Sequence, residues 1–321
     1  MEPLLEVSGL HVGFGACRVL DGVDFAVGAG QTLALLGESG SGKSVTARAI
    51  MGLVRPPRGR VTAGSVRLDG RDLLALGEEE RRKLRATTIA MVFQDALSAL
   101  NPVLTVGYQI AELFRAHRGL SRKQARVKAI EALDMVRIPA AAKRVRDYPH
   151  QFSGGMRQRV GIALAIALEP RVIIADEPTT ALDVTVQAQI IKLLGEIQRE
   201  HGTALVLITH DMGVVADIAD RVAIMYAGRV VEQGGAAEVY ARPAHPYTAA
   251  LLGAIPRPSL RGRRLSVIPG APPDLAARTD ACAFQPRCRY AGAACDRAPD
   301  AREIEPGRLA ACHEWERVTT G

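Results

Sequence analysis

A glycine-rich segment near the N-terminus has the residue types and spacing of a phosphate-binding loop. The run Gly37-Glu38-Ser39-Gly40-Ser41-Gly42-Lys43-Ser44 fits the pattern G-x-x-x-x-G-K-[ST]. Its glycines let consecutive N–H groups point at one anion, and a helix that begins near Ser44 adds the positive end of its dipole. Lys43 is expected to reach the β- and γ-phosphates of a nucleotide, and the Ser44 hydroxyl to bind Mg²⁺. These residues predict a nucleoside triphosphate site.

Two adjacent carboxylates follow an apolar run much later in the chain. The segment Val172-Ile173-Ile174-Ala175-Asp176-Glu177 reads as a buried strand that delivers both acids at its carboxyl end, where ligands bind in open α/β sheets. Asp176 is expected to hold Mg²⁺, directly or through water, and Glu177 to polarise the attacking water. Phosphoryl transfer depends on positioning and charge neutralisation more than on covalent chemistry. The two motifs together predict a P-loop NTPase without saying which kind.

Apolar strands and helical patterns must position these motifs. Buried strands that alternate with helical patterns imply a mainly parallel sheet covered by helices. The expected strands are Leu4–Val12, Val23–Val27, Gln31–Leu36, Ser65–Leu68, Arg171–Ala175 and Ala204–Thr209. Helical spacing covers Ile110–Phe114, Ser121–Val136 and Met156–Leu168. These helices predict a helical subdomain inserted at about residues 96–169, and a proline-rich, loop-rich tail begins near Ala236.

Composition bounds the class of protein. The 321 residues include 41 Lys and Arg against 34 Asp and Glu, a net charge of +7. This excess fits either a solvated surface or a basic face towards phosphates or anionic headgroups. No signal peptide is recognisable, and the longest apolar stretch, near Val160–Leu168, has about half the length of a membrane span. We therefore expect a cytoplasmic protein that relies on other subunits for any work at a membrane.

A third motif separates the two nucleotide motifs. Phe152-Ser153-Gly154-Gly155-Met156-Arg157-Gln158-Arg159 stands just before a helix and offers backbone N–H groups at the helix N-terminus. This run resembles the LSGGQ signature of the ATP-binding cassette (ABC) ATPases. In that family the signature binds the γ-phosphate of ATP held by the opposite subunit. The resemblance implies that role for Ser153, Gly154, Gly155 and Met156.

Other landmarks of the ABC ATPases follow in order, and each role is implied by the resemblance. Gln94, in Val92-Phe93-Gln94-Asp95, matches the Q-loop, which contacts Mg²⁺ and water and senses the membrane subunit. Asp183, in Ala181-Leu182-Asp183, matches the D-loop at the dimer interface, and His210 matches the switch histidine. Phe14 stands where the family stacks an aromatic ring on adenine. The implied catalytic residues are Glu177, His210 and Gln94, and the implied Mg²⁺ ligands are Ser44, Gln94 and Asp176.

The resemblance also implies an architecture. It predicts an α/β fold: a P-loop NTPase of the ABC type with a mainly parallel sheet, an N-terminal antiparallel β subdomain and an inserted helical subdomain. The cassette is expected at residues 1–235. A small, loop-rich C-terminal cysteine domain is expected at residues 236–321.

The spacing and the tail indicate a branch of the family. Ser153 lies 116 residues after Gly37, which leaves no room for the long coiled coil of chromosome-maintenance ABC proteins, and the chain has one cassette where ABC translation factors have two. The segments Pro243–Thr248 and Cys282–Cys288 resemble the region after the cassette in oligopeptide/dipeptide importers, and Phe152 and Met156 resemble the dipeptide D-type subunit. This implies peptide import at the cytoplasmic face of a bacterial membrane, with two permease subunits, a second ABC ATPase in a heterodimer, an indirectly acting substrate-binding protein, and no nucleic acid.

Four cysteines in the tail need an explanation of their own. Cys282, Cys288, Cys295 and Cys312 are separated by five, six and sixteen residues and show no Cys-x-x-Cys knuckle of a zinc ribbon. Thiolates in irregular loops suit an iron–sulfur cluster, and some members of the importer family carry a 4Fe-4S cluster at the matching cysteines. Zinc and reduced structural thiols remain alternatives. We expect a structural cluster in a tail that docks on the partner ATPase.

Three other functions remain open from the sequence. A related importer could carry nickel, glutathione or another small solute. A DNA- or ribosome-associated ABC ATPase could use the basic surface. A metal-sensing regulatory subunit could use the cysteines to control assembly.

Overall fold

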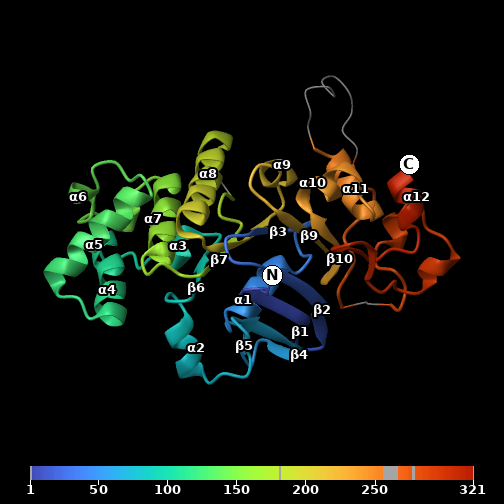
Figure 1. Cartoon of the computed structure of the whole chain (residues 1–321), viewed down its shortest axis with the longest axis horizontal. Helices are drawn as coiled ribbons and strands as arrows, with labels where there is room; N and C mark the ends of the chain where they lie inside the picture. Colours follow the sequence, from blue (N-terminus) through green and yellow to red (C-terminus); the bar gives the residue numbers. More distant parts are fainter. Residues whose placement is uncertain (1, 181, 256–266, 277–278, 321) are drawn as a thin grey trace. The chain divides into compact units, whose positions relative to one another are not determined.

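The computed structural model describes residues 2–180, 182–255, 267–276 and 279–320, which form two compact units (Figure 1). Unit 1 comprises Met1–Glu2, Val27–Gln31 and Ala75–Ile208. Unit 2 comprises Pro3–Ala26, Thr32–Leu74 and Thr209–Gly321. The predicted α/β class is confirmed. The proposed boundary between residues 235 and 236 stays a prediction.

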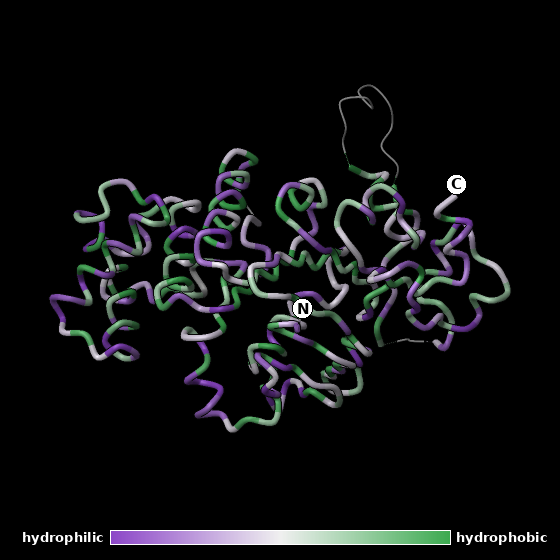
Figure 2. The backbone as a smooth tube through the Cα atoms, in the orientation of Figure 1, coloured by the Kyte–Doolittle hydropathy of each residue, from purple (hydrophilic) through white to green (hydrophobic). Residues whose placement is uncertain are grey.

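Unit 1 contains three parallel strands, β6 (Ile89–Val92), β7 (Val172–Asp176) and β8 (Ala204–Thr209). Strand β7 pairs in parallel with both neighbours. Every residue of the three strands is buried, which agrees with their largely apolar sequences. The hydrophobic colouring of the strands in Figure 2 contrasts with the hydrophilic helix α2 (Glu78–Leu84), which has no buried residue.

The chain between β6 and β7 is helical, as the periodicity predicts. It contains α3 (Ala96–Ala99), α4 (Val106–Arg118), α5 (Arg122–Met135), α6 (Ala141–Arg144), a 3-10 turn (Pro149–Gln151) and α7 (Gly154–Ile166). Thr105 caps α4, and Ser121 with Gln124 forms a capping box on α5. Helix α5 packs on α4 and α7, and α7 also contacts β6. The last helix of unit 1 is α8 (Val184–His201).

The N-terminal part of unit 2 is a four-stranded sheet in the order β2-β1-β4-β5. The strands are β1 (Leu5–Phe14), β2 (Cys17–Val27), β4 (Arg60–Leu68) and β5 (Arg71–Asp72). Strand β4 runs antiparallel to β1 and β5. Leu5, Val7, Leu10 and Val12 are all buried on β1. The predicted antiparallel N-terminal sheet is confirmed.

Unit 2 also carries the strand that leads into the phosphate loop. Strand β3 (Thr32–Leu36) is fully buried and runs parallel to β9 (Arg221–Tyr226), and β10 (Arg229–Gly235) runs antiparallel to β9. Helix α1 (Lys43–Ile50) follows β3 after the glycine-rich segment. Two short helices, α9 (Met212–Val215) and α10 (Ala236–Ala241), flank β9 and β10 in the sequence. The parallel strand pairs of both units agree with the predicted mainly parallel core.

The tail is built into unit 2. It contains α11 (Pro246–Gly253), two 3-10 turns (Gln285–Arg287 and Ala293–Asp296), β11 (Arg302–Glu305), β12 (Arg308–Ala310) and α12 (Trp315–Thr320). Strand β12 pairs antiparallel with β10. It also brings the buried guanidinium of Arg308 to the buried carboxylate of Glu232, with N and O 3.1 Å apart. Burial raises the pKa of Glu232. Removal of either partner would leave a buried charge without its counter-charge, which destabilises the fold.

None of the helices in the described ranges is both long enough and apolar enough to cross a bilayer.

Candidate nucleotide site

The phosphate loop in unit 2 accepts only glycine at two of its positions. Gly37 and Gly42 have φ of 150° and 109°. A Cβ on Gly37 would lie 2.3 Å from the carbonyl oxygen of Met225, and one on Gly42 would lie 2.7 Å from Cδ2 of Leu20. Because any side chain would collide there, the loop keeps the tight curvature that the motif predicts.

Lys43 is buried inside its own loop. Its Nζ donates to the carbonyl oxygens of Gly37, over 2.8 Å, and Glu38, over 3.0 Å. The hydroxyl oxygen of Ser41 is buried and finds no hydrogen-bond partner among the described residues. A buried hydroxyl without a partner, next to a lysine in a glycine-rich loop, fits a bound phosphate, whose oxygens would accept from the Ser41 hydroxyl.

Two further predicted residues lie in unit 2. Phe14 ends β1 with 37% of its surface exposed. A Cβ added to Gly59 would lie 2.7 Å from the Phe14 ring, so the ring packs directly on that glycine. His210 is exposed at the end of β8, next to Asp211, which caps α9. The adenine-stacking and switch roles of Phe14 and His210 remain predictions.

Unit 1 holds the two acids at the end of β7. Asp176 is buried, and Glu177 has a φ of 44°, in the left-handed region that non-glycine residues seldom occupy. The Glu177 N–H donates to the carbonyl oxygen of Ile208 over 2.9 Å. Such a backbone costs about 1–3 kcal/mol and persists where surrounding contacts enforce it, often at functional sites.

The Glu177 side chain is oriented by two neighbours. Its Oε2 accepts from Gln94 Nε2 over 3.1 Å and from Thr180 Oγ1 over 2.9 Å. The structure therefore brings together two of the predicted catalytic residues, Gln94 and Glu177. Thr180 was not among the predicted site residues, and the only sequence signal for it is its position three residues after Glu177.

The signature and the D-loop segment lie side by side in unit 1. Ser153 caps α7, and its Oγ accepts from the N–H of Met156 over 3.4 Å. Asp183 caps α8 and accepts from the N–H of Val186 over 2.9 Å. A Cβ on Gly155 would lie 2.6 Å from Cγ1 of Val186, so the two helix starts pack too closely for a side chain at residue 155. Ala181 of the D-loop segment lies outside the described residues.

A buried glutamine links the signature helix to the Q-loop. Gln158 in α7 is buried, and its Nε2 donates to the carbonyl oxygen of Phe93 over 3.3 Å. Phe93 directly precedes Gln94 in the chain. Sequence reasoning assigned Gln158 no role, because a glutamine inside a helix is ordinarily a surface residue.

The predicted site residues divide between the two units. Unit 2 holds Phe14, Gly37, Ser39, Gly40, Ser41, Gly42, Lys43, Ser44, His210 and the tail cysteines. Unit 1 holds Gln94, Ser153, Gly154, Gly155, Met156, Asp176, Glu177 and Asp183.

The four tail cysteines form no disulfide, and Cys282, Cys288 and Cys295 lie close enough to Cys312 to influence its ionisation. Burial raises the pKa of Cys312 to about 12 and also raises the pKa of Cys282 and Cys288. Backbone N–H groups donate to Sγ of Cys288 over 3.3 Å and to Sγ of Cys312 over 3.4 Å. In the part of the chain that the structure describes, however, no three Cys, His, Asp or Glu side chains are grouped to hold a metal ion.

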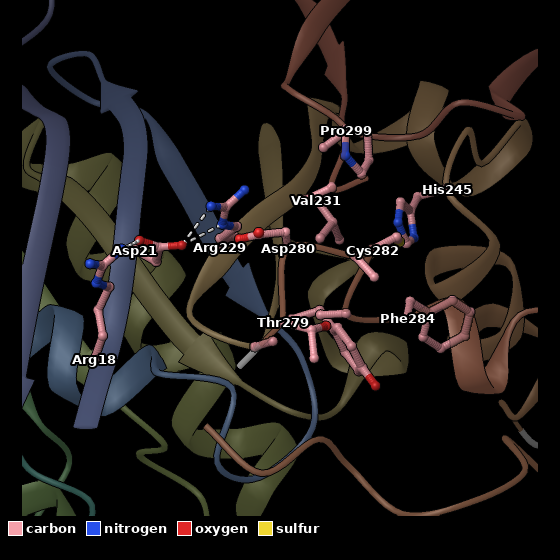
Figure 3. A pocket seen from close by; sticks show the side chains of 16 residues that line it. Arg18, Asp21, Arg229, Val231, His245, Thr279, Asp280, Cys282, Phe284 and Pro299 are labelled. Carbon is pink, nitrogen blue, oxygen red and sulfur yellow. Dashed lines mark hydrogen bonds and ion pairs between the residues drawn. The ribbon is translucent and has the colours of Figure 1, made fainter. Parts of the chain in front are cut away.

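A cavity of about 250 Å³ lies in unit 2 between the cassette strands and the tail (Figure 3). Asp21 on its wall accepts from Arg229 Nε over 2.7 Å and from Arg18 Nη1 over 2.9 Å. Cys282 is the one lining residue that belongs to a predicted site. The cavity is therefore not the phosphate site.

The phosphate loop, the paired acids and the capped signature helix on this α/β fold define an ABC-type ATPase. A model of the family described as "ABC transporter" matches residues 20–180, and one described as "Oligopeptide/dipeptide transporter, C-terminal region" matches residues 231–295. The chain belongs to the ATP-binding subunits of the oligopeptide/dipeptide ABC transporters.

Individual relatives agree with this membership. The chain is 50% identical to the oligopeptide transport ATP-binding protein OppD of Salmonella typhimurium, covering 96% of this chain and 93% of the relative. It is 49% identical to the dipeptide transport ATP-binding protein DppD of Bacillus subtilis, covering 92% of this chain and 90% of the relative. Among solved structures, the dimeric post-hydrolysis state of the cassette MJ0796 bound to ADP and Pi matches with a TM-score of 0.65 and 30% identity, covering 72% of this chain and 98% of that one.

Proposed function

We propose that the chain hydrolyses ATP to energise the import of di- and oligopeptides across the bacterial cytoplasmic membrane, at whose cytoplasmic face it binds. The ATPase part rests on the oriented carboxylate of Glu177, which Gln94 and Thr180 hold through one oxygen. The peptide part rests on the similarity to oligopeptide and dipeptide transport ATP-binding proteins and on the matched C-terminal region at residues 231–295.

ATP binds first to the chain's own phosphate loop. Lys43 exchanges its backbone carbonyl partners for the β- and γ-phosphates, and Phe14 stacks on adenine. Ser44, Gln94 and Asp176 would hold Mg²⁺, which neutralises charge on the phosphates when bound. Glu177 then orients the attacking water, and His210 contacts the γ-phosphate.

A second ATPase subunit completes each site. The signature residues Ser153, Gly154, Gly155 and Met156 close over ATP on the partner, and Asp183 lies at that interface. ATP favours the closed dimer because it contacts both subunits only in that state. Hydrolysis removes this preference and the dimer reopens. The Gln158 contact with Phe93 supports a mechanical link between the signature helix and the Q-loop.

The complete transporter has four further components in this proposal. Two permease subunits cross the membrane, a different ABC ATPase forms the heterodimer, and a substrate-binding protein delivers the peptide. Substrate choice lies in those other proteins, so a related solute such as nickel or glutathione is the second candidate cargo. No nucleic acid takes part.

We also propose that Cys282, Cys288, Cys295 and Cys312 hold a 4Fe-4S cluster that ties the tail together. The N–H groups directed at Cys288 and Cys312 are of the kind that stabilise cluster thiolates. Because the described side chains form no ready group of metal ligands, the cysteine loops must close further around the cluster. Zinc and reduced thiols are the alternatives, and the cluster has no part in the ATP reaction.

Purification of the tagged chain from its native membrane tests the assignment to a peptide importer. Two hydrophobic permeases, a second ATPase with an LSGGQ signature and a peptide-binding protein are expected to copurify. Recovery with ribosomes or DNA, and without a permease, would contradict the proposal.

A further inference from the structure

The tail holds an acidic residue of the phosphate loop. Glu38 is the second residue of the loop, and both of its carboxylate oxygens accept from one arginine of the tail. Arg287 Nη1 lies 2.7 Å from Oε2, and Nη2 lies 3.0 Å from Oε1. This is the two-pronged geometry in which a guanidinium fixes a carboxylate most firmly.

Arg287 is itself held rigidly. Its Nε donates to the carbonyl oxygen of Pro269 over 2.8 Å, and Nη1 also lies 3.3 Å from the hydroxyl of Tyr226. The guanidinium carbon lies 5.8 Å from the centre of the Tyr226 ring and 5.9 Å from that of Phe284. The whole residue is 8% exposed. A buried arginine with this many partners has little freedom to leave Glu38.

The backbone of Glu38 connects the tail to the phosphate-binding lysine. Its N–H donates to the hydroxyl of Tyr247 in α11 over 2.7 Å. Its carbonyl oxygen accepts from Lys43 Nζ over 3.0 Å and from the N–H of Ser41 over 3.2 Å. One loop residue therefore contacts the tail through its side chain and N–H, and contacts Lys43 through its carbonyl oxygen.

A carboxylate in a loop that binds phosphate opposes binding, because both groups are negatively charged. Glu38 repels the phosphates unless its charge is neutralised, and the loop must also be ordered before nucleotide binds with little entropic cost. Arg287 meets both needs: it supplies the compensating charge and it fixes the side chain of Glu38.

We propose that Arg287 is a positioning residue for ATP binding, which neutralises Glu38 and holds the phosphate loop from the tail. This inference rests on the proposed ATP-binding function of the loop. Arg287 touches no reacting atom, so it affects the affinity for nucleotide and not the chemical step.

The test measures the dissociation constant of the ATP analogue AMP-PNP, with Mg²⁺, on the purified full chain. Arg287→Met is expected to raise that constant about tenfold, equivalent to about 1.4 kcal/mol. In the assembled transporter the same variant is expected to raise KM for ATP and to leave kcat within about twofold. Arg289→Met is the matched control, because Arg289 is an exposed arginine of the same tail that contacts Tyr290.

A double variant separates this role from simple support of the fold. Glu38→Gln removes the carboxylate that Arg287 neutralises, so Arg287→Met/Glu38→Gln is expected to bind AMP-PNP several-fold more tightly than Arg287→Met alone. A purely structural arginine gives no such recovery, since the second substitution restores no contact. Glu38→Gln alone keeps Arg287 in place. If Arg287→Met does not fold, the affinity of Glu38→Gln for AMP-PNP is measured in its stead.

Two results would overturn the inference. One is an unchanged dissociation constant in Arg287→Met. The other is a double variant that binds AMP-PNP no better than Arg287→Met. If Arg287→Met does not fold, the contradicting result is a Glu38→Gln variant whose affinity for AMP-PNP changes no more than that of the control Arg289→Met. If the unaltered chain does not bind AMP-PNP at all, the proposed function fails instead.

Discussion

Gln94 donates a hydrogen bond of 3.1 Å to Oε2 of Glu177, a residue 83 positions further along the chain. Thr180 donates to the same oxygen over 2.9 Å. These two hydrogen bonds orient the carboxylate at the end of β7. A water-activating group needs this kind of support, because an error of about 1 Å can cost about a hundredfold in rate.

Glu177→Gln is expected to bind ATP and to hydrolyse it at least about a hundredfold more slowly, because the positioned base is lost. Steady-state phosphate release and AMP-PNP binding measure the two properties separately. Glu196→Gln is the control, since Glu196 is an acid of the same unit whose partner is Arg137 on the surface. Near-normal turnover in Glu177→Gln would remove Glu177 from the role.

Gly155→Ala is expected to lower ATP turnover on the order of a hundredfold, because the new Cβ would collide with Val186 and displace the signature. Binding of AMP-PNP to the chain's own loop should not change. Gly161→Ala in the same helix is the control, because its Cβ would make only an ordinary contact with Ala96 at 4.0 Å. Equal turnover in the two variants would show that the close packing at Gly155 does not position the signature.

His245 makes the folding of the tail dependent on pH. The residue is buried, its Nδ1 accepts from the N–H of Tyr247, and burial lowers its pKa to about 3. The unfolded chain, with a pKa of about 6.5, binds more protons between pH 6.5 and 3. The contribution of His245 is therefore fully present above pH 6.5 and is lost as the pH falls through this window.

Between pH 7.5 and 5.5 this group is expected to lower the free energy of unfolding by about 1.4 kcal/mol. Urea unfolding followed by the fluorescence of Trp315, the one tryptophan, measures the change. His245→Asn keeps an acceptor and cannot titrate, so it should lose less stability over the same range. His117→Asn, at an exposed site, should behave like the unaltered chain. Identical pH dependence in all three proteins would contradict the assignment to His245.

Anaerobic purification tests the proposed cluster. The brown protein is expected to contain about four iron and four sulfide per chain, and Cys288→Ser should lose both. Cys17→Ser, outside the tail, is the control. About one zinc per chain without sulfide would contradict the cluster and support a zinc site. The absence of any metal would contradict the cluster and support reduced thiols.

The general fold was accessible from sequence because its signals are local. The buried strands of the core are unbroken apolar runs, so Ala204–Thr209 was predicted with its exact bounds and β7 was placed within one residue. Helical spacing likewise indicated the helices between β6 and β7. The short strands β11 and β12 were not predicted, because a pairing such as Glu232 with Ala310 leaves no periodic trace in a few residues.

The contacts that orient the site were not accessible in the same way. The bond between Arg287 and Glu38 joins residues 249 positions apart, and nothing in a proline-rich loop identifies one arginine among many. The contacts of the tail with its own phosphate loop were not predicted. Docking of the tail on a partner ATPase stays a prediction. The roles of the motif residues likewise rest on the family pattern until the variants are measured.

Peptide uptake by the reconstituted transporter tests the central claim most directly. Proteoliposomes that contain this chain, its partner ATPase and the permeases are supplied with the binding protein, a labelled dipeptide or oligopeptide, and ATP on the side that this chain faces. Uptake is expected to require ATP and to fall at least about tenfold with Glu177→Gln. Uptake that continues without ATP or is unaffected by this variant, or transport of nickel or glutathione with none of peptide, would contradict the account.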